Sequence, residues 1–286
     1  MHMREVYLNG EYLPETEAQI SIFDRGFLFA DAVYEVTTVV DGKLIGFDGH
    51  IERLQRSCDE LKFGYNVDKA DMLEIHRELV KRNSLDQGMI YLQLTRGNPG
   101  DRDFAFPPAE TPPTLVLFTQ EKKVVGTAVE QTGLKVISIE DLRWGRRDIK
   151  TVQLLYPSLA KMEAKARGCD DAWMVQDGHV TEGTSNNAYI VKDGVIITRD
   201  LSSDILHGIT RKSVLECAAL LQMKVEERPF TVDEVRSADE AFATSASGFT
   251  NPIVEIDGAP VGDGKPGPVA AKLRETYIRE NMKASI

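Results

Sequence analysis

Lys150 and Glu182 are the two residues of this sequence whose types and settings suggest chemistry most directly. Lys150 follows Asp148-Ile149, and Glu182 comes 32 residues later (182 − 150) within the polar run Thr181–Asn187. A lysine amine can form a Schiff base with a carbonyl group, and a carboxylate can hold a protonated ring nitrogen. Taken singly, a lysine is usually a solvated side chain and a polar run is usually a β-turn. Lys150 and Glu182 therefore indicate a function only when they are considered together with other residues of the sequence.

Three arginines lie close to Lys150 along the chain, namely Arg143, Arg146 and Arg147. If they fold near Lys150, like-charge repulsion would favour its uncharged, nucleophilic amine.

Other segments could bind an anion. Arg53 falls beside the apolar face of an expected helix, where a guanidinium could reach a phosphate through two hydrogen bonds. Gly208-Ile209-Thr210 precedes a helix expected from Arg211, with Thr210 as its N-cap, and helix N-termini attract anions. Thr244–Gly248 is a small polar turn that could add backbone and hydroxyl donors. An exposed arginine, an ordinary helix start and an ordinary loop are the alternatives.

The surrounding pattern predicts an α+β fold in two halves, which would position these residues. We expect an N-terminal domain over residues 1–120, a linker over 121–128 and a C-terminal domain over 129–286. Apolar spacing predicts two helices in the first half, one with Ile51, Leu54, Cys58 and Leu61 on a face and one with Met72, Ile75, Leu79 and Val80. The remaining elements are helices over 157–167 and 211–222 and strands over 33–40, 89–95, 114–119, 134–139, 173–176, 188–191, 195–198 and 240–244.

A long loop over residues 98–113 interrupts the first half. It is rich in proline and contains the aromatic residues Phe104 and Phe106. Loops of this length in compact domains are usually functional or disordered. The aromatic residues favour the functional interpretation.

Composition narrows the classes of function. The chain has 286 residues, a 42% apolar and 28% charged composition, and a net charge of −11, which disfavours nucleic acids and anionic membranes as partners. No stretch has the length of a membrane span, and Met1–Tyr7 has no apolar core of a signal peptide, so a cytoplasmic location is expected. Cys58, Cys169 and Cys217 form neither a metal motif nor a disulfide framework, and reduced thiols are expected.

Taken in order, seven segments resemble the fold type IV enzymes that depend on pyridoxal 5'-phosphate (PLP), and especially the D-amino acid transaminases. The resemblance covers nearly the whole chain. The segments are Ser21–Glu35, Gly49–Leu54, Asp148–Lys150, Thr181–Asn186, His207–Arg211, Ala243–Ser247 and Val254–Gly258.

The resemblance implies a two-domain PLP transaminase, with small-molecule amino donors and 2-oxo acids as substrates, that forms a homodimer. Lys150 would bind PLP covalently and move a proton during catalysis, and Glu182 would pair with the pyridine nitrogen. Leu206 would pack on the ring. The remaining residues implied in cofactor binding are Arg53, Ser185, Ile209, Thr210, Ser245 and Ala246. Tyr34 and Ser247 would contact the substrate.

The sequence departs from the familiar D-amino acid transaminases in the long loop. Those enzymes bind the substrate carboxylate with an Arg-x-His motif, whereas here Arg102 is followed two residues later by Phe104. Arg96 and Arg25 are further candidates for the carboxylate site. Because Phe104 would tolerate substrates without a carboxylate, an (R)-amine transaminase remains an alternative. A PLP lyase like aminodeoxychorismate lyase is another, while the pocket strands of branched-chain L-amino acid transaminases are not apparent.

Overall fold

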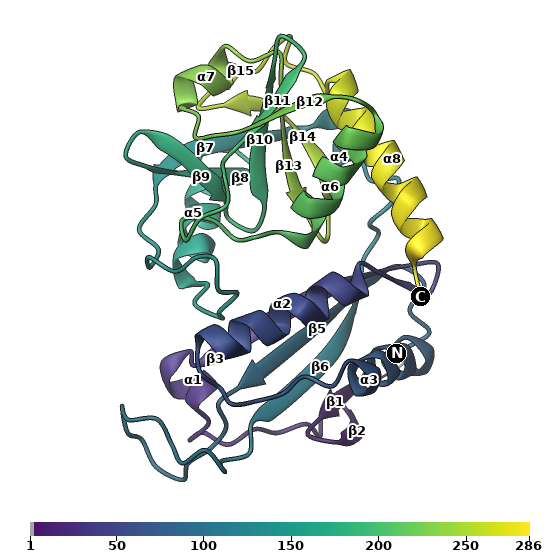
Figure 1. Ribbon diagram of the computed structural model, residues 1–286, viewed down its shortest axis with the longest axis vertical. Coiled ribbons are helices and arrows are strands. Elements are labelled where there is room, and N and C mark those ends of the chain that lie inside the picture. Colours follow the sequence, from purple (N-terminus) through teal and green to yellow (C-terminus); the bar gives the residue numbers. More distant parts are fainter. Residues whose placement is uncertain (1–2) are drawn as a thin grey trace. The chain divides into compact units, whose positions relative to one another are not determined.

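The computed structural model describes residues 3–286 and divides them into two compact units (Figure 1). Met1 and His2 lie outside the described residues. They are the first two residues of the expected N-terminal domain and of the segment Met1–Tyr7, in which no signal peptide is expected. The first unit runs to Val124 and also includes Ile149–Gln153 and Ala284–Ile286, and the second includes Val125–Asp148 and Leu154–Lys283. The expected C-terminal domain over 129–286 includes two short segments, Ile149–Gln153 and Ala284–Ile286, that belong to the first unit.

A six-stranded antiparallel sheet in the order β2-β1-β6-β5-β3-β4 forms the first unit. Helices α2 and α3 pack against it (Figure 1). The strands are β1 (Glu5–Leu8), β2 (Glu11–Pro14), β3 (Ala32–Val40), β4 (Lys43–Ile45), β5 (Gly88–Thr95) and β6 (Thr114–Glu121), and the helices are α1 (Arg25–Phe29), α2 (Phe47–Glu60) and α3 (Lys69–Arg82).

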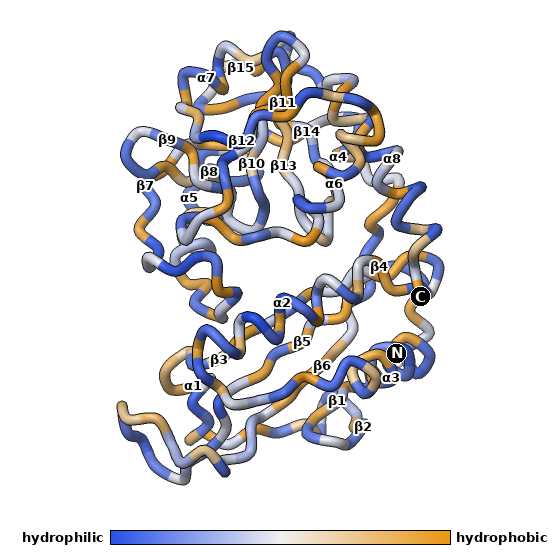
Figure 2. Tube along the Cα trace, in the orientation of Figure 1, coloured by the Kyte–Doolittle hydropathy of each residue, from blue (hydrophilic) through white to orange (hydrophobic). Residues whose placement is uncertain are grey.

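The apolar faces expected from the sequence form the core of this unit. Ile51, Leu54 and Cys58 of α2 are at most 4% exposed and pack in one cluster with residues of β3, β5 and α3. Figure 2 shows the corresponding alternation of hydrophilic and hydrophobic residues along α2. Between β3 and β4, Asp41 and Gly42 both have positive φ (50° and 70°), as a two-residue hairpin turn requires.

The second unit contains a nine-stranded mixed sheet in the order β12-β11-β10-β13-β14-β7-β8-β9, with β15 paired to β14. Its strands are β7 (Leu134–Glu140), β8 (Asp171–Gln176), β9 (His179–Gly183), β10 (Asn187–Lys192), β11 (Val195–Thr198), β12 (Lys224–Glu227), β13 (Glu240–Ser245), β14 (Phe249–Ile256) and β15 (Ala259–Pro260). Its helices are α4 (Val129–Thr132), α5 (Leu155–Ala166), α6 (Ile209–Leu220), α7 (Val232–Arg236) and α8 (Pro268–Ala284).

The α+β prediction is confirmed, and two local predictions are wrong. Helix α6 begins at Ile209 with Gly208 as its N-cap, so Thr210 lies inside the first turn and is not the cap. Glu182 lies on strand β9, which was not predicted because Thr181-Glu182-Gly183 looks like a polar turn. Pro157 does fall in the first turn of its helix, although α5 starts at Leu155.

The three cysteines are free thiols, with Cys58 and Cys217 buried and Cys169 partly exposed. Among residues 3–286, no helix is long and apolar enough to cross a membrane.

Candidate active site

Lys150 is held against strand β3 by the short segment Ile149–Gln153. Ile149 is 3% exposed and belongs to the core of the first unit. Thr151 forms an antiparallel bridge with Val33, and the backbone N–H of Tyr34 donates to the carbonyl oxygen of Lys150 at 3.0 Å. These contacts fix the backbone on both sides of Lys150. Its ammonium nitrogen lies 4.1 Å from the centroid of the Tyr34 ring, within the range of a cation–π contact.

Arg53 is oriented by a buried carboxylate. Its Nε and Nη2 atoms donate to the two carboxylate oxygens of Glu35, each at 2.7 Å, and His50 Nδ1 lies 2.7 Å from Glu35 Oε2. Burial alone would raise the pKa of Glu35, but the charge and hydrogen bonds of Arg53, assisted by His50, hold that pKa at about 2. His50 shows the opposite balance, because burial lowers its pKa despite Glu35, and Lys150 adds to that lowering.

Replacing Glu35 by glutamine is expected to lower the free energy of unfolding by about 3 kcal/mol at pH 7, because Arg53 would stay buried without its counter-charge. The native pKa of about 2 lies below the ordinary value of 4.5. The carboxylate therefore stabilises the fold fully above pH 4.5, and that contribution disappears as the pH falls toward 2. Urea unfolding of both proteins at pH 7, 5 and 4 should show the difference shrinking toward acid.

The matched control for this substitution is Glu78→Gln, which removes a partly exposed partner of Arg82 on α3. It should leave the unfolding curve unchanged. Equal stability of wild type and Glu35→Gln at all three pH values would show that Arg53 does not depend on Glu35.

Glu182 is a buried carboxylate with three donors. Arg143 Nη1 donates to its Oε1 at 2.6 Å, while Asn187 Nδ2 and the Leu206 backbone N–H donate to its Oε2 at 3.0 and 3.1 Å. The side chain is 5% exposed. Burial raises the pKa of Glu182 above its ordinary value, and the charge of Arg143 opposes this effect. The geometry fixes the plane of the carboxylate, and a further cation near it would favour the ionised form.

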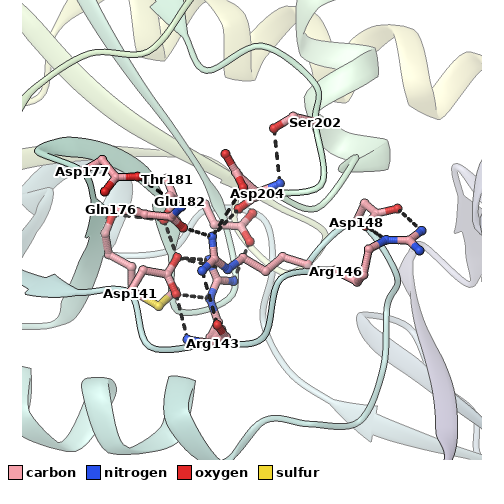
Figure 3. Close-up of polar contacts among 12 residues, drawn as sticks. Asp141, Arg143, Arg146, Asp148, Gln176, Asp177, Thr181, Glu182, Ser202 and Asp204 are labelled. Carbon is pink, nitrogen blue, oxygen red and sulfur yellow. Dashed lines mark hydrogen bonds and ion pairs between the residues drawn. The ribbon is translucent and has the colours of Figure 1, made fainter.

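Arg143 connects Glu182 to a second buried carboxylate, Asp141 (Figure 3). Its Nε and Nη2 atoms donate to the two oxygens of Asp141 at 2.9 and 2.7 Å. Thr181 Oγ1 donates to the same Asp141 at 2.7 Å. A continuous series of hydrogen bonds thus joins Glu182 to Arg143, Asp141 and Thr181.

The three arginines near Lys150 in the sequence are all paired with carboxylates of the second unit, whereas Lys150 belongs to the first. Arg143 pairs with Asp141 and Glu182, Arg146 with Asp148, and Arg147 with Asp141. The structure therefore gives no support to the expectation that these arginines act on Lys150.

Two turns of the second unit carry the residues expected to bind phosphate. The N-cap residue of α6 is Gly208, which has no side chain. The backbone N–H groups of the first turn therefore donate to no N-cap side chain. Ile209 is partly exposed there and Thr210 is buried. Ser245 ends β13, and Ala246 and Ser247 follow it in the turn to β14; all three residues are partly exposed. Both turns offer the donor types that an anion needs.

Leu206 and Ser185 occupy different settings around Glu182. The backbone of Leu206 binds both Glu182 and Asn187, whose Nδ2 donates to the Leu206 carbonyl oxygen at 2.9 Å. Ser185 is exposed in the turn after β9. Its neighbours Thr184 and Asn186 donate to Asp171, at 2.5 and 2.7 Å.

Arg25 and Arg96 meet at Asp31, to which both donate from Nε at 2.8 Å. Arg25 Nη1 donates to the carbonyl oxygens of Asp103 and Ala105 in the long loop. Arg96 donates to the carbonyl oxygens of Leu61 and Lys62. Its guanidinium also lies 4.4 and 3.8 Å from the ring centroids of Phe63 and Phe106. Both arginines are at most 8% exposed and serve as anchors for the surrounding chain.

Arg102 contrasts with these two anchors. Its guanidinium lies 5.0 Å from the ring centroids of Phe29 and Phe104. Among residues 3–286 this guanidinium donates to no carboxylate or carbonyl group, whereas the Arg102 backbone N–H donates to Asp101 Oδ1 at 2.7 Å. Phe104 itself is 76% exposed. Arg102 is therefore the arginine of the three that retains its donors for a ligand.

The loop over 98–113 is closed at its base. Strands β5 and β6 pair up to Thr95 and Thr114. Gly97 has a φ of +86°, and a Cβ there would clash with the carbonyl oxygen of Pro112. The Gly97 carbonyl oxygen also accepts the Arg25 backbone N–H at 2.9 Å. The two ends of the loop therefore meet at Gly97 and Pro112.

Sequence reasoning missed Glu35, His50 and Asn187 as site residues and gave Arg143 a different role. Glu35 could have been found as a lone acidic residue in the apolar strand Ala32–Val40. His50 and Arg53 lie one helical turn apart on α2, which is the spacing needed to share one carboxylate. No local signal connects Arg143 with Glu182, because that contact joins the segment after β7 to β9.

Comparison with known proteins is consistent with this arrangement. The family model of class IV aminotransferases matches residues 32–256, and the chain belongs to this family. It is 38% identical to a D-alanine aminotransferase of Staphylococcus aureus (strain MSSA476), over 96% of this chain and 97% of that protein. Identity to the D-alanine aminotransferase of Bacillus licheniformis is 36%, over 98% and 99% of the two chains.

A solved structure extends the similarity to three dimensions. The branched-chain aminotransferase from the thermophilic archaeon Thermoproteus uzoniensis, crystallised with norvaline, superimposes with a TM-score of 0.85 at 25% identity. The match covers 98% of this chain and 95% of that one. A further branched-chain amino acid aminotransferase, crystallised with pyridoxamine 5'-phosphate, gives a TM-score of 0.87 at 27% identity. These similarities confirm the expected fold type.

Proposed function

We propose that this protein is a PLP-dependent transaminase that transfers the amino group of D-amino acids to a 2-oxo acid such as 2-oxoglutarate or pyruvate. The observation that carries the proposal is Glu182, a buried carboxylate fixed by Arg143, Asn187 and the Leu206 backbone. Such a group suits a protonated ring nitrogen. Similarity at 36–38% identity to D-alanine aminotransferases over almost the whole chain supports the choice of substrate.

The donor set fits PLP. Glu182 can pair with the ring nitrogen, and Arg53 is a cation that Glu35 already orients for a phosphate. The backbone N–H groups of Ile209 and Ala246 and the hydroxyl of Thr210 complete the proposed phosphate ligands. We assign Leu206 to the ring face, and Ser185 and Ser245 to the edge of the cofactor site.

Bound PLP supplies an electron sink that stabilises negative charge at the substrate Cα. The protein's own contributions follow from the residues described. Lys150 holds the cofactor through its ε-amine and then takes and returns the proton at Cα. Glu182 keeps the ring nitrogen protonated through its fixed negative charge. Tyr34 orients the Lys150 side chain, since its ring lies beside the ammonium nitrogen.

Arg102 is the proposed ligand of the substrate carboxylate. Arg25 and Arg96, the other candidates, already donate to Asp31 and to backbone carbonyls. We expect Arg102→Ala to raise KM for D-alanine by about 10- to 100-fold, because a charged hydrogen bond is lost. KM for (R)-1-phenylethylamine, which has no carboxylate, should stay the same.

The matched control is Arg102→Lys, which keeps the positive charge and should recover part of the loss for D-alanine. Unchanged D-alanine kinetics in Arg102→Ala would remove this residue from the carboxylate site. The remaining candidates for the carboxylate site would then be Arg96, Arg25 and Ser247 in the β13–β14 turn.

Transamination of (R)-amines is the second candidate, and Phe104 is the observation that favours it. This side chain occupies the position where the familiar Arg-x-His motif has histidine, and it contacts Phe29 with ring centroids 5.4 Å apart. An apolar side chain at this position would suit a substrate that has no carboxylate.

Mixing the PLP form with D-alanine, L-leucine and (R)-1-phenylethylamine in separate stopped-flow experiments tests the proposal. Loss of the absorbance of the lysine-bound cofactor with D-alanine, and formation of pyridoxamine phosphate, is the expected result. A response to the amine alone would favour amine transamination. A response to none of the three, with normal cofactor absorbance, would contradict the proposal and favour a lyase.

We also propose that the enzyme is a cytoplasmic homodimer. Exposed apolar side chains on α5 and in the segment before it support self-association: Leu142, Leu155, Leu159 and Met162 are 57–76% exposed. The free thiols of Cys58, Cys169 and Cys217 suit a reducing compartment. Light scattering of the purified protein tests the dimer, and a monomeric mass would contradict it.

A further inference from the structure

Arg147 is a buried cation of the second unit that takes no part in the proposed mechanism. Its residue exposure is 8%. Burying a guanidinium group is unfavourable unless its N–H donors find partners within the protein. The contacts of Arg147 therefore indicate what this side chain does in the fold.

On one side, Arg147 binds the segment that carries Arg143. Its Nη2 atom donates to the backbone carbonyl oxygen of Arg143 at 3.3 Å, and its Nε atom lies 3.5 Å from Asp141 Oδ2. Its Nη1 atom donates to Oε1 of Gln176, the last residue of β8, at 2.5 Å. The side chain of Arg143 donates to Glu182 Oε1. Arg147 therefore binds the backbone of the residue whose side chain holds one oxygen of Glu182.

On its other side, Arg147 contacts the β11–α6 loop, which comprises residues 199–208. Its Nη1 atom lies 3.5 Å from the backbone carbonyl oxygen of Asp204 and 3.9 Å from Oδ1 of the same residue. Leu206 follows in this loop, and its backbone N–H donates to the second oxygen of Glu182, Oε2, at 3.1 Å. Arg147 is thus close to the donors of both carboxylate oxygens.

Hydrogen bonds connect Asp204 to the rest of the loop and to Arg147. The backbone N–H of Asp204 donates to Ser202 Oγ at 3.2 Å (Figure 3), and its Oδ2 accepts Arg199 Nη2 at 2.7 Å. The backbone N–H of Arg147 donates to the carbonyl oxygen of Ser203 at 2.9 Å. A displacement of Asp204 would therefore move neighbouring residues of the loop with it.

We propose that Arg147 is a positioning residue for Glu182, which sets the spacing between the donors to its two oxygens. Its planar guanidinium joins the backbone of Arg143 to Asp204 in the loop that carries Leu206. The inference rests on the proposed function, because Glu182 is assigned there to the ring nitrogen of PLP. Arg147 acts through Arg143 and Leu206 and is not itself a ligand of the ring.

Hydrogen exchange of the Leu206 amide in apoenzyme tests this positioning without the cofactor. Arg147→Met removes every side-chain donor but keeps an unbranched stem, and the two neighbouring carboxylates retain Arg143 and Arg199 as partners. The backbone hydrogen bond of residue 147 is also retained. We expect the Leu206 amide to exchange about tenfold faster, the effect of about one lost hydrogen bond, with the amides of β13 unchanged.

Cofactor binding tests the consequence for the ring nitrogen. The two probes are PLP and 1-deaza-PLP, which has carbon in place of that nitrogen and cannot pair with Glu182. Their dissociation constants are measured from the absorbance of the lysine-bound form. In Arg147→Met we expect the Kd for PLP to rise about tenfold and the Kd for 1-deaza-PLP to change less than about twofold.

Two further variants complete the test. The matched control is Arg167→Met, which removes an exposed arginine of the same unit that pairs with Glu163, and it should match wild type in both measurements. Arg147→Lys keeps the charge without the planar fork, so it should restore only part of each loss. Thermal unfolding of each apoenzyme is measured alongside. If Arg147→Met does not fold, Arg147→Lys becomes the deciding variant.

Exchange of the Leu206 amide at the wild-type rate in the deciding variant would overturn the inference. An equal loss of affinity for PLP and 1-deaza-PLP would also overturn it, because that result indicates a general effect on the fold. Both outcomes leave the proposed function intact. If wild-type apoenzyme shows no lysine-bound cofactor with PLP, the proposed function and the inference fail together.

Discussion

Replacing Lys150 by alanine is expected to slow transamination of D-alanine by about four orders of magnitude. The variant loses the amine that holds the cofactor and also loses the general base at Cα, and proton transfer by a positioned base alone contributes up to about 10⁴-fold. Steady-state turnover with D-alanine and 2-oxoglutarate measures the loss. Added methylamine, which can supply a free base in the space left by the side chain, should restore part of the rate.

The control for this experiment is Lys43→Ala, which removes an exposed lysine of strand β4 in the same unit. It should show wild-type turnover. Activity of Lys150→Ala at the wild-type rate would contradict the mechanism and would require a different catalytic amine.

The second large effect is expected from Glu182→Gln. Glutamine fills nearly the same volume, but its single carbonyl oxygen can accept either from Arg143 or from Asn187 and Leu206, which donate to different oxygens of Glu182. We expect the cofactor to remain bound through Lys150. The neutral amide no longer favours a protonated ring nitrogen, and the half-reaction with D-alanine should slow by about 100-fold or more. A single-turnover absorbance measurement separates this effect from cofactor loss.

Glu163→Gln provides the matched control, because Glu163 is an exposed residue of α5 that pairs with Arg167. Its half-reaction should match wild type. An unchanged single-turnover rate in Glu182→Gln would show that the buried carboxylate does not act on the ring nitrogen.

The parts of the fold that could be predicted are those governed by short-range periodicity. The apolar spacing of Ile51, Leu54 and Cys58 predicts a helix with one buried face, and α2 buries that face. The β-branched run from Val33 to Val40 predicts a strand ending at a tight turn, as observed in β3. These signals work because burial of one face decides both the element and its orientation.

Parts of the candidate site escaped prediction because long-range contacts determine them. The segment around Lys150 joins the first unit through Ile149 in the core and the bridge from Thr151 to Val33, which are 118 residues apart (151 − 33). Glu182 lies on β9 because this segment pairs with β8, and Arg143 and Asn187 donate to its carboxylate there. Neither partner is apparent from the polar character of the run around Glu182.

The closed base of the loop over 98–113 has a consequence for the evolution and engineering of this enzyme. Since Gly97 and Pro112 meet at the end of the β5–β6 hairpin, the loop can change in length without separating the strands, and the entropy of closing a longer loop rises only slowly. The segment that carries Arg102 and Phe104 is therefore an exchangeable module. Transplanting a loop with an Arg-x-His motif onto this stem should alter which substrates are accepted while the hydrophobic core stays untouched.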